Sequence, residues 1–196
     1  MPVYNGELYL AEAIESILNQ TFTDFEFIIV DDASTDSTSA ILENYQKQDS
    51  RIKIVTNSEN LMISRTLNKG LNIASSDLIA RMDADDIAFP NRLEKQYLFM
   101  REKPEITVCG SFTKIIGTGN ELRLPLVDKA VRAKLLFLNC IAHPSTIMKK
   151  QKLMEHGGYS TQFHLTEDYA LWVKLAEDPS VKFANIPESL LHYRII

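Results

Sequence analysis

Three carboxylates directly follow a short apolar run near the middle of the chain. The run 78–82 is typical of a buried strand, and Asp83, Asp85 and Asp86 stand at its end. Open α/β sheets bind their ligands just beyond the carboxyl ends of the strands. Carboxylates this close repel one another, and Mg²⁺ or Mn²⁺, which prefer oxygen ligands, would remove that cost. Asp83 and Asp85 lie two apart on an extended segment, so we expect both to face one metal or one nucleotide. The alternative is an acidic turn that only caps the next helix.

A second strand also runs into acidic residues. The segment 25–30 is rich in aromatic and β-branched residues, and Asp31 and Asp32 follow it. A carboxylate at a strand end can accept hydrogen bonds from the N–H of a base or from ribose hydroxyls. Tyr4, the last residue of a short strand expected at 1–4, can offer a face on which a base stacks. The alternatives are turn residues ahead of a helix for the two aspartates, and a plain core or surface aromatic for Tyr4.

A third acidic pair, Glu167 and Asp168, opens the last expected helix. An acid at this place can act as a general base that takes a proton from an acceptor hydroxyl. Because adjacent helix residues point in different directions, we expect only one of the two to face the reaction centre. The alternative is a favourable interaction of both with the helix dipole. His143 is a lone histidine, for which a structural role is favoured over contact with an acceptor or a metal. Arg65 and Arg81 can offset the acidic crevice, touch a diphosphate, or simply remain in solvent.

Length and composition limit the class of protein. The 196 residues are 45% hydrophobic and 24% charged, which is ordinary for one soluble globular domain. A net charge of −5 without a basic patch argues against nucleic acid as a partner. Two cysteines without a C-x-x-C pair indicate a reducing compartment and no zinc site. Because no apolar run reaches roughly 18 residues and no signal peptide is visible, we expect a cytoplasmic protein. Docking on a membrane surface stays open.

Strands and helices are expected to alternate over the first ninety residues, which is typical of a parallel sheet with right-handed crossovers. No G-x-G-x-x-G or Walker A sequence is present, so the ordinary dinucleotide and P-loop modes of nucleotide binding are not expected. The expected strands are 1–4, 25–30, 52–55, 78–82, 106–116, 122–126, 142–148, 181–186 and 190–193. The expected helices are 7–20, 37–48, 63–74, 90–101, 127–138, 149–155 and 166–176. We therefore expect an α/β fold in one domain, a Rossmann-like, mostly parallel sheet flanked by helices, with a smaller α+β second half.

Four motifs in this order resemble glycosyltransferase family 2, whose members have the GT-A fold. They are Pro-Val-Tyr-Asn at 2–5, Val-Asp-Asp-Ala-Ser-Thr-Asp at 30–36, Ala-Arg-Met-Asp-Ala-Asp-Asp at 80–86, and Glu-Asp-Tyr-Ala-Leu-Trp at 167–172. Pro-Asn-Arg-Leu-Glu-Lys-Gln at 90–96 also resembles the family. Each motif is weak alone, but the ordered and suitably spaced set is specific and spans nearly the whole chain.

The resemblance implies an inverting transfer of a sugar from a nucleotide-sugar donor, often UDP-linked, with a divalent metal. In a single domain over 1–196, residues 1–100 would bind the donor and residues 101–196 the acceptor. Within the donor half, Pro2 belongs to the donor-binding segment, and Tyr4 and Asp32 match the positions that hold the base.

The resemblance also assigns the remaining acidic residues. Asp83 matches the first acid of the D-x-D motif, near the ribose and the metal, and Asp85 matches the second, a metal ligand. Asp168 matches the acid assigned as catalytic base, with Glu167 as its neighbour. The implied acceptor is a saccharide or a lipid-linked saccharide, most commonly in bacterial surface polysaccharide or lipopolysaccharide synthesis at the inner face of the membrane.

This sequence departs from the family pattern at three places. The family usually has a full first strand before Pro2, of which little is present here, and relatives commonly continue beyond Tyr193. Met62 stands where many relatives carry glycine. A bulky side chain there is expected to narrow the donor site.

Two other interpretations stay open. The segment 83–87 also resembles the D-x-D-x-[TV] nucleophile motif of haloacid-dehalogenase-type phosphatases, although that motif usually comes near the N-terminus and here about eighty residues precede it. A non-catalytic module that binds nucleotide-sugars without turnover is the second, against which Asp83, Asp85 and Asp168 argue.

Overall fold

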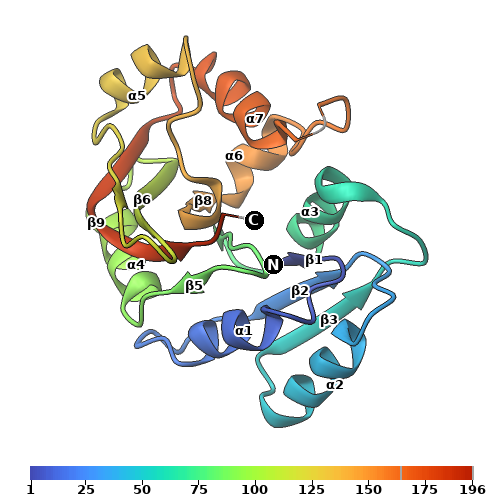
Figure 1. Cartoon of the computed structure of the whole chain (residues 1–196). Helices are drawn as coiled ribbons and strands as arrows, with labels where there is room; N and C mark the ends of the chain where they lie inside the picture. The colour runs from blue at the N-terminus through green and yellow to red at the C-terminus, as the bar shows by residue number, and fades with distance from the viewer. Residues whose placement is uncertain (164, 196) are drawn as a thin grey trace.

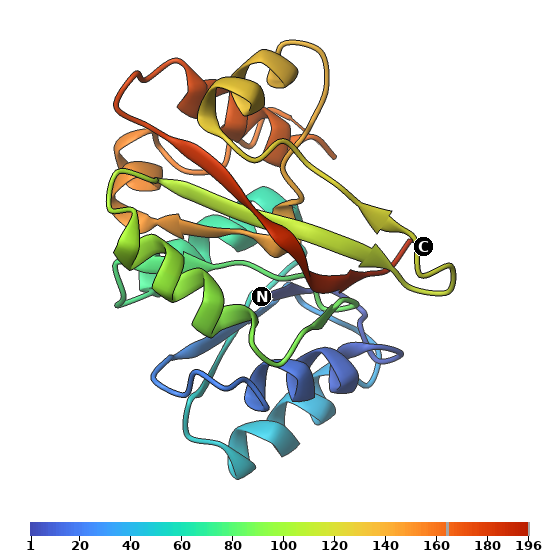
Figure 2. The same ribbon diagram turned by 90° about the vertical axis from the view of Figure 1, so that its left-hand side faces the viewer.

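Two β-sheets form the centre of the molecule and helices cover them (Figures 1 and 2). The computed structural model describes residues 1–163 and 165–195. The first sheet is entirely parallel, in the order β1-β2-β3, and the second is mixed, in the order β4-β8-β6-β9-β5, with β7 paired to β6. The strands are β1 (Pro2–Val3), β2 (Phe27–Asp31), β3 (Ile52–Thr56), β4 (Leu78–Ala80), β5 (Ile87–Ala88), β6 (Val108–Ile115), β7 (Glu121–Leu122), β8 (Ile147–Lys149) and β9 (Phe183–Tyr193).

The helices connect these strands and lie within a few residues of the expected ranges. None of those in the described part of the chain combines the length and apolar character needed to cross a bilayer. They are α1 (Leu10–Leu18), α2 (Thr38–Gln48), α3 (Met62–Ile73), α4 (Arg92–Glu102), α5 (Asp128–Leu135), α6 (Lys150–Glu155) and α7 (Glu167–Ala176), and a 3₁₀ turn lies at His143–Ser145.

The parallel sheet is covered by α1, whose sequence has the period of an amphipathic helix. Leu10, Ala13, Ile14 and Ile17 recur at helical spacing and are all buried. This apolar stripe packs into one cluster with residues of β1, β2 and β3. The burial fixes the first sheet and therefore the positions of the loops that leave its strands.

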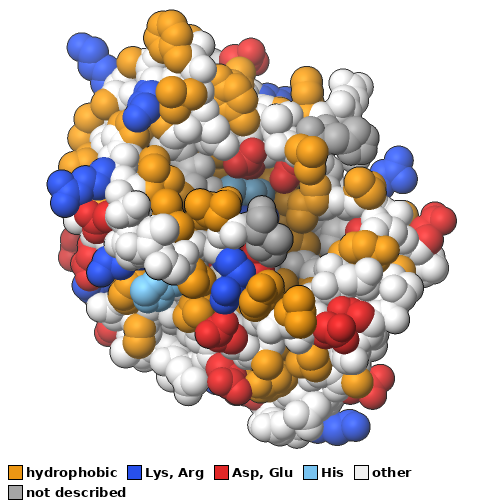
Figure 3. All heavy atoms as spheres, in the orientation of Figure 1, with side chains coloured by type: hydrophobic (Ala, Val, Ile, Leu, Met, Phe, Trp, Pro, Cys, Tyr) orange, Lys and Arg blue, Asp and Glu red, His pale blue; other side chains and the backbone are white. Residues whose placement is uncertain are grey.

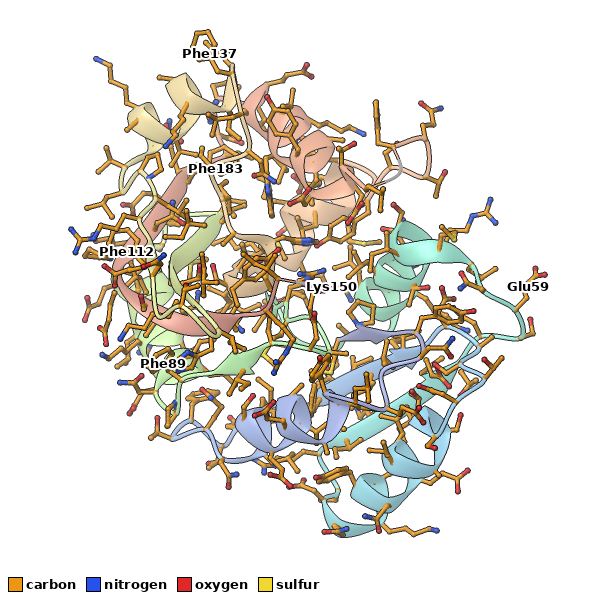
Figure 4. The ribbon with its side chains drawn as sticks, viewed as in Figure 1. Glu59, Phe89, Phe112, Phe137, Lys150 and Phe183 are labelled. Carbon is orange, nitrogen blue, oxygen red and sulfur yellow. The ribbon has the colours of Figure 1, made fainter. Side chains whose placement is uncertain are left out.

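A second core lies against the mixed sheet. Trp172 of α7 and Phe183 of β9 are fully buried there, and Figure 4 shows Phe183 inside the fold. Phe137 lies at the tip of a loop after α5, points away from the body and is 83% exposed. Because α7 is held by this core, the acidic residues of its first turn have a fixed place beside the sheet.

The predicted α/β class is confirmed, but parallel pairing is less extensive than expected. The segment 78–82 was expected to extend the parallel sheet, whereas β4 pairs antiparallel with β8, Ile79 opposite Met148. In the described structure β1 pairs with β2 and makes no ladder with β4. The strand β8 from the second half instead satisfies the backbone groups on one edge of β4.

The two short strands expected at 181–186 and 190–193 are instead one strand, β9. It runs parallel to β6, side by side with it in Figure 2, and the register shifts between Ser111 and Thr113. The shift falls opposite Pro187, which lacks an N–H and cannot donate to a ladder. A β-bulge absorbs the proline without ending the strand.

Arg92 of α4 joins the residues that follow β4 to the turn that precedes β8. Its guanidinium is fully buried, and its Nη2 donates to the carbonyl oxygens of Arg81 at 2.5 Å and Thr146 at 3.4 Å. Its Nε donates to Oε1 of Gln96 at 3.1 Å. Burial lowers the pKa of Arg92 to about 10, so the group still carries its charge at neutral pH.

We predict that Arg92→Met lowers the free energy of unfolding by about 3 kcal/mol, because it leaves the buried Arg81 carbonyl without its charged donor. Denaturant unfolding at pH 7 measures the change. Arg101→Ala, at an exposed position of the same helix, is the control and should stay within about 0.5 kcal/mol of the parent. Equal effects of the two substitutions would contradict the assigned role.

Candidate active site at the strand ends

The two aspartates after β2 have different environments. The carboxylate of Asp31 is buried, and each of its oxygens has a hydrogen-bond donor: the N–H of Ser34 at 3.1 Å and the hydroxyl of Ser39 at 3.2 Å. Oδ1 of Asp32 accepts from Nδ2 of Asn57 at 2.6 Å and from the N–H of Leu61 at 2.9 Å. In the described structure no donor reaches its Oδ2. Asp31 therefore shapes the turn, while Asp32 keeps a fixed acceptor for a ligand.

Tyr4 lies at the end of the neighbouring strand. The carbonyl of Val3 accepts the N–H of Asp32 at 2.8 Å, which sets the two strand ends side by side. Asn5 joins the loops that follow, because its N–H donates to Oγ of Ser34 at 2.9 Å. The ring of Tyr4 is 51% exposed. The structure thus places an open aromatic ring and a half-occupied carboxylate at adjacent strand ends, as the sequence predicts. Pro2 lies in β1 itself.

Arg65 and Met62 lie on α3, which follows the loop held by Asp32. Arg65 is exposed, so the described structure gives it no role beyond proximity to this loop. Met62 has a φ of +67°, a left-handed conformation that side chains with a Cβ rarely adopt. Its side chain is 53% exposed. The φ angle gives a physical reason for a glycine at this position, and the expected narrowing of the donor site stays a prediction.

The carboxylates after β4 converge. Asp83, Asp85 and Asp86 each offer one oxygen, and these oxygens lie within 4.8 Å of one another. Asp83 is fixed by Arg81, whose two terminal nitrogens each contact one of its oxygens at 2.5 Å. The sequence left open whether Arg81 lies in solvent or beside the acidic residues. The structure shows its side chain buried, 6% exposed, and paired with Asp83.

The electrostatics of this acidic group fit a cation. Burial, followed by the neighbouring Asp83, raises the pKa of Asp85. Burial also raises the pKa of Asp86 to about 7. Oδ2 of Asp86 is buried and has no hydrogen-bond partner in the described structure. Three converging carboxylates, one of which has a buried oxygen without a partner in the described structure, have the donor chemistry that a hard divalent cation requires. Sequence analysis did not include Asp86 among the ligands.

Arg194, near the end of β9, supports the acidic group from the other end of the chain. Its N–H donates to Oδ1 of Asp86 at 2.8 Å, and its Nε donates to the carbonyl of Asp85 at 2.8 Å. Its guanidinium lies over the ring of Tyr9, 3.9 Å from the centroid. Sequence reasoning missed this contact because no local pattern links residues more than a hundred positions apart.

Glu167 and Asp168 open α7 near the same strand end. Oδ2 of Asp168 accepts from Nδ2 of Asn139 at 2.7 Å, and its Oδ1 accepts from the N–H of Tyr169 at 2.6 Å. Glu167 is buried and its Oε2 has no partner in the described structure. Burial and then Asp168 raise the pKa of Glu167, and the charge of Asp83 adds to this rise.

His143 is buried below this region. Its Nε2 lies 2.8 Å from the hydroxyl of Tyr159, and the ring meets Trp172 edge-on. Burial and the nearby Arg81 hold the pKa of His143 well below its usual value. The ring is neutral and packed, which fits the favoured structural role. A contact of His143 with an acceptor or a metal stays a prediction. Figure 3 shows acidic side chains and a histidine at the bottom of a hollow on this face.

Comparison with known proteins agrees with this geometry. The sequence model of the family described as Glycosyl transferase family 2 matches residues 1–162. Over 201 residues the chain is 37% identical to the O-antigen biosynthesis glycosyltransferase WbnJ of Escherichia coli, covering 100% of this chain and 78% of that protein. The chain belongs to glycosyltransferase family 2. An uncharacterized glycosyltransferase of Haemophilus influenzae is 37% identical over 98% of this chain, which spans 63% of that relative.

Solved structures show that the fold is shared. TarS of S. aureus in complex with UDP-GlcNAc superposes with a TM-score of 0.83 at 20% identity, covering 100% of this chain and 57% of that one. The mannosyltransferase PcManGT of Pyrobaculum calidifontis, in complex with GDP-Man and Mn²⁺, has a TM-score of 0.78 at 17% identity and covers 98% and 55%. The GT-A fold expected from the sequence is confirmed. The family match leaves the phosphatase interpretation of 83–87 without support.

For this family 2 chain we predict that Met62→Gly raises the free energy of unfolding by about 1 kcal/mol, because glycine adopts a φ of +67° without strain. The same substitution in a right-handed helix, Met154→Gly, should lower it by about 1 kcal/mol, because glycine there only adds entropy to the unfolded chain. Denaturant unfolding of both variants measures the two opposite signs. A loss of stability in Met62→Gly would contradict the assigned strain.

Proposed function

We propose that this protein transfers a sugar from a UDP-linked nucleotide-sugar to an acceptor hydroxyl with inversion at the anomeric carbon. The observation that carries the proposal is the convergence of three carboxylates within 4.8 Å, with a buried, unpartnered oxygen on Asp86, beside a second acidic pair on α7. The relatives and structural neighbours named above support it, since their names include transferases that bind UDP-GlcNAc or GDP-Man.

Asp32 and Tyr4 would bind the base. Asn57 and the N–H of Leu61 hold Oδ1 of Asp32, so its Oδ2 is oriented to accept the ring N–H of a uracil. Nζ of Lys69 donates to Oδ1 of Asn57 at 2.6 Å, which fixes the direction in which the Asn57 amide points. The open ring of Tyr4 would then stack on the base.

Asp83, Asp85 and Asp86 would hold a divalent cation, Mn²⁺ or Mg²⁺. When bound, such a cation neutralises the charge of the leaving diphosphate. The chain itself orients these ligands, since Arg81 holds Asp83, and Arg194 holds Asp86 and the backbone at Asp85.

Asp168 would act as the general base. Asn139 and the N–H of Tyr169 each donate to one of its two oxygens, which would orient the carboxylate for an incoming hydroxyl. It takes the acceptor proton as that oxygen attacks the anomeric carbon from the side opposite the diphosphate. A single displacement inverts the centre, whereas retention by double displacement needs a second, nucleophilic carboxylate close to that carbon. Glu167, buried behind it, would be a positioning neighbour.

The acceptor is proposed to be a saccharide or lipid-linked saccharide in surface polysaccharide synthesis. One relative is named as an O-antigen biosynthesis enzyme, and another, at 29% identity over 100% of this chain, as a glucosyltransferase acting on a diphosphoundecaprenol-linked sugar. Residues 1–100 would supply the donor site and residues 101–196 the acceptor site. With such an acceptor, the sugar transfer would take place at the cytoplasmic face of the membrane.

We predict that Asp85→Ala abolishes metal-dependent binding of UDP, because it removes a proposed ligand of the cation. Calorimetric titration of UDP with Mn²⁺ and then with EDTA measures this. Asp77→Ala, at the opposite end of the same strand segment and exposed, is the matched control and should bind as the parent does. If the parent itself binds UDP equally well with EDTA, the metal assignment is wrong.

We predict that Asp168→Asn keeps UDP binding and lowers kcat by a factor on the order of 10²–10⁴, since the amide cannot accept the proton. Turnover of radiolabelled UDP-sugars measures the rate. Glu177→Gln, an exposed acid just after the same helix, should leave the rate unchanged. Near-normal turnover of Asp168→Asn would overturn its role. A parent that binds UDP but turns over no donor with any acceptor would favour the non-catalytic module.

A further inference from the structure

Three consecutive apolar side chains extend into solvent just after α5. Leu136 is 78% exposed, Phe137 is 83% exposed and Leu138 is 47% exposed, and we call these three residues the apolar tip. The tip is an ordered continuation of the helix, because the N–H groups of Phe137 and Leu138 donate to the carbonyl of Lys134 at 3.0 and 3.1 Å. A run of exposed apolar residues is unfavourable in water, so the tip indicates a contact surface.

The helix that carries the tip presents positive charge, although the whole chain has a net charge of −5. Lys129 and Lys134 of α5 are both exposed. The acid of this helix, Asp128, is already paired, with Arg132 at 3.0 Å and with Lys182 at 3.5 Å. Figure 3 shows basic and hydrophobic side chains together at the top of the view, over α5. The surface around the tip is therefore complementary to an anionic partner.

Both ends of the apolar tip are joined to the first turn of α7. The carbonyl of Leu135 accepts the hydroxyl of Tyr169 at 2.6 Å, and Nδ2 of Asn139 donates to Oδ2 of Asp168 at 2.7 Å. Phe137 is two residues from Asn139, which corresponds to at most about 7 Å of chain. The tip and the proposed general base therefore belong to one connected unit of the acceptor half.

We propose that the apolar tip inserts into an anionic lipid bilayer, at the boundary between headgroups and acyl chains, with Lys129 and Lys134 against the headgroups. A basic helix that bears leucine and phenylalanine has the chemistry of an interfacial membrane anchor. A second copy of this chain fits the surface less well. A stable interface needs about 800 Å² from each partner, more than three side chains provide, and two positive surfaces repel each other.

The docking gives the acceptor half a defined orientation. Asp168 would lie close beneath the membrane surface, where a sugar attached to a lipid carrier can reach it while the lipid stays in the bilayer. This consequence rests on the proposed function, whereas the docking itself does not. The surface is also separate from the proposed base-binding residues Tyr4 and Asp32, which lie at the strand ends of the parallel sheet.

Sedimentation with lipid vesicles tests the docking. The full chain should bind mixed phosphatidylglycerol and phosphatidylcholine vesicles, and should bind pure phosphatidylcholine vesicles more weakly. The double variant Leu136→Ser/Phe137→Ser should lose binding by a factor on the order of ten or more, because it removes most of the inserted apolar area. Leu8→Ser, at a position ahead of α1 that is 79% exposed, is the matched control and should bind as the parent does.

The contribution of charge is measured separately. Lys129→Gln/Lys134→Gln should lower binding to the anionic vesicles roughly tenfold and leave the weaker binding to pure phosphatidylcholine almost unchanged. Lys47→Gln/Lys103→Gln removes the same charge from exposed positions on α2 and after α4, and is the control. It should change binding by less than about twofold, because charges beyond a Debye length from the lipid are screened.

Fluorescence of Phe137→Trp locates the contact, because the single tryptophan of the parent, Trp172, is fully buried. The emission of Phe137→Trp should shift to shorter wavelength on anionic vesicles and be quenched by lipids with brominated acyl chains. Leu8→Trp should show neither change.

A parent that does not bind the anionic vesicles, equal binding of the parent and Leu136→Ser/Phe137→Ser, or an unchanged emission of Phe137→Trp would overturn the proposal. Dimerisation of the parent without vesicles, if the tip variant abolished it, would assign the surface to a second copy and also overturn the membrane role. Vesicle binding is measured without donor, acceptor or metal, so these outcomes are independent of whether the protein transfers a sugar.

Discussion

The structure depends on holding three carboxylates together where a strand leaves the protein interior. Their mutual repulsion and partial burial are unfavourable, which is visible in the raised pKa values of Asp85 and Asp86. Two arginines offset this cost from opposite directions along the chain. Arg81 pairs with Asp83 within the same turn, and Arg194 reaches back from the last strand. The fold therefore keeps these carboxylates together in an anionic pocket at the strand end, and such a set of oxygens has the donor chemistry that a hard divalent cation requires.

Neighbouring acids in this protein repeatedly have different roles. Both oxygens of Asp31 accept hydrogen bonds near its own turn, while one oxygen of Asp32 has no donor in the described structure. On α7, Asp168 is held by two donors while Glu167 beside it is buried with an unpartnered oxygen. The difference in each pair comes from the hydrogen-bond partners that the surrounding loops supply. Two neighbouring carboxylates can therefore differ in role, one stabilising a turn or a core and the other remaining available to a ligand.

Sequence reasoning located the acidic strand ends because strand periodicity and the order of charged residues are local properties. It assigned Asp83 and Asp85 together, and the structure brings them together. It could not find Arg194 or Asn139, whose contacts cross the chain and leave no periodic signal. It also misplaced segment 78–82, because the partner of a strand is decided by which backbone edge is free, and a propensity pattern contains no information about that.

The bonds made by Arg194 have a consequence for the order of events during synthesis. Its Nη2 contacts Oε2 of Glu12 at 2.9 Å, across 182 positions of sequence, and its backbone holds Asp86 across 108. Contacts of such long sequence separation form late in folding, after the loops that they close have been ordered. The N-terminal strands and helices can thus emerge from a ribosome and pack locally, while the acidic pocket stays incomplete. A nascent chain of this protein acquires its anionic pocket only when strand β9 has been made.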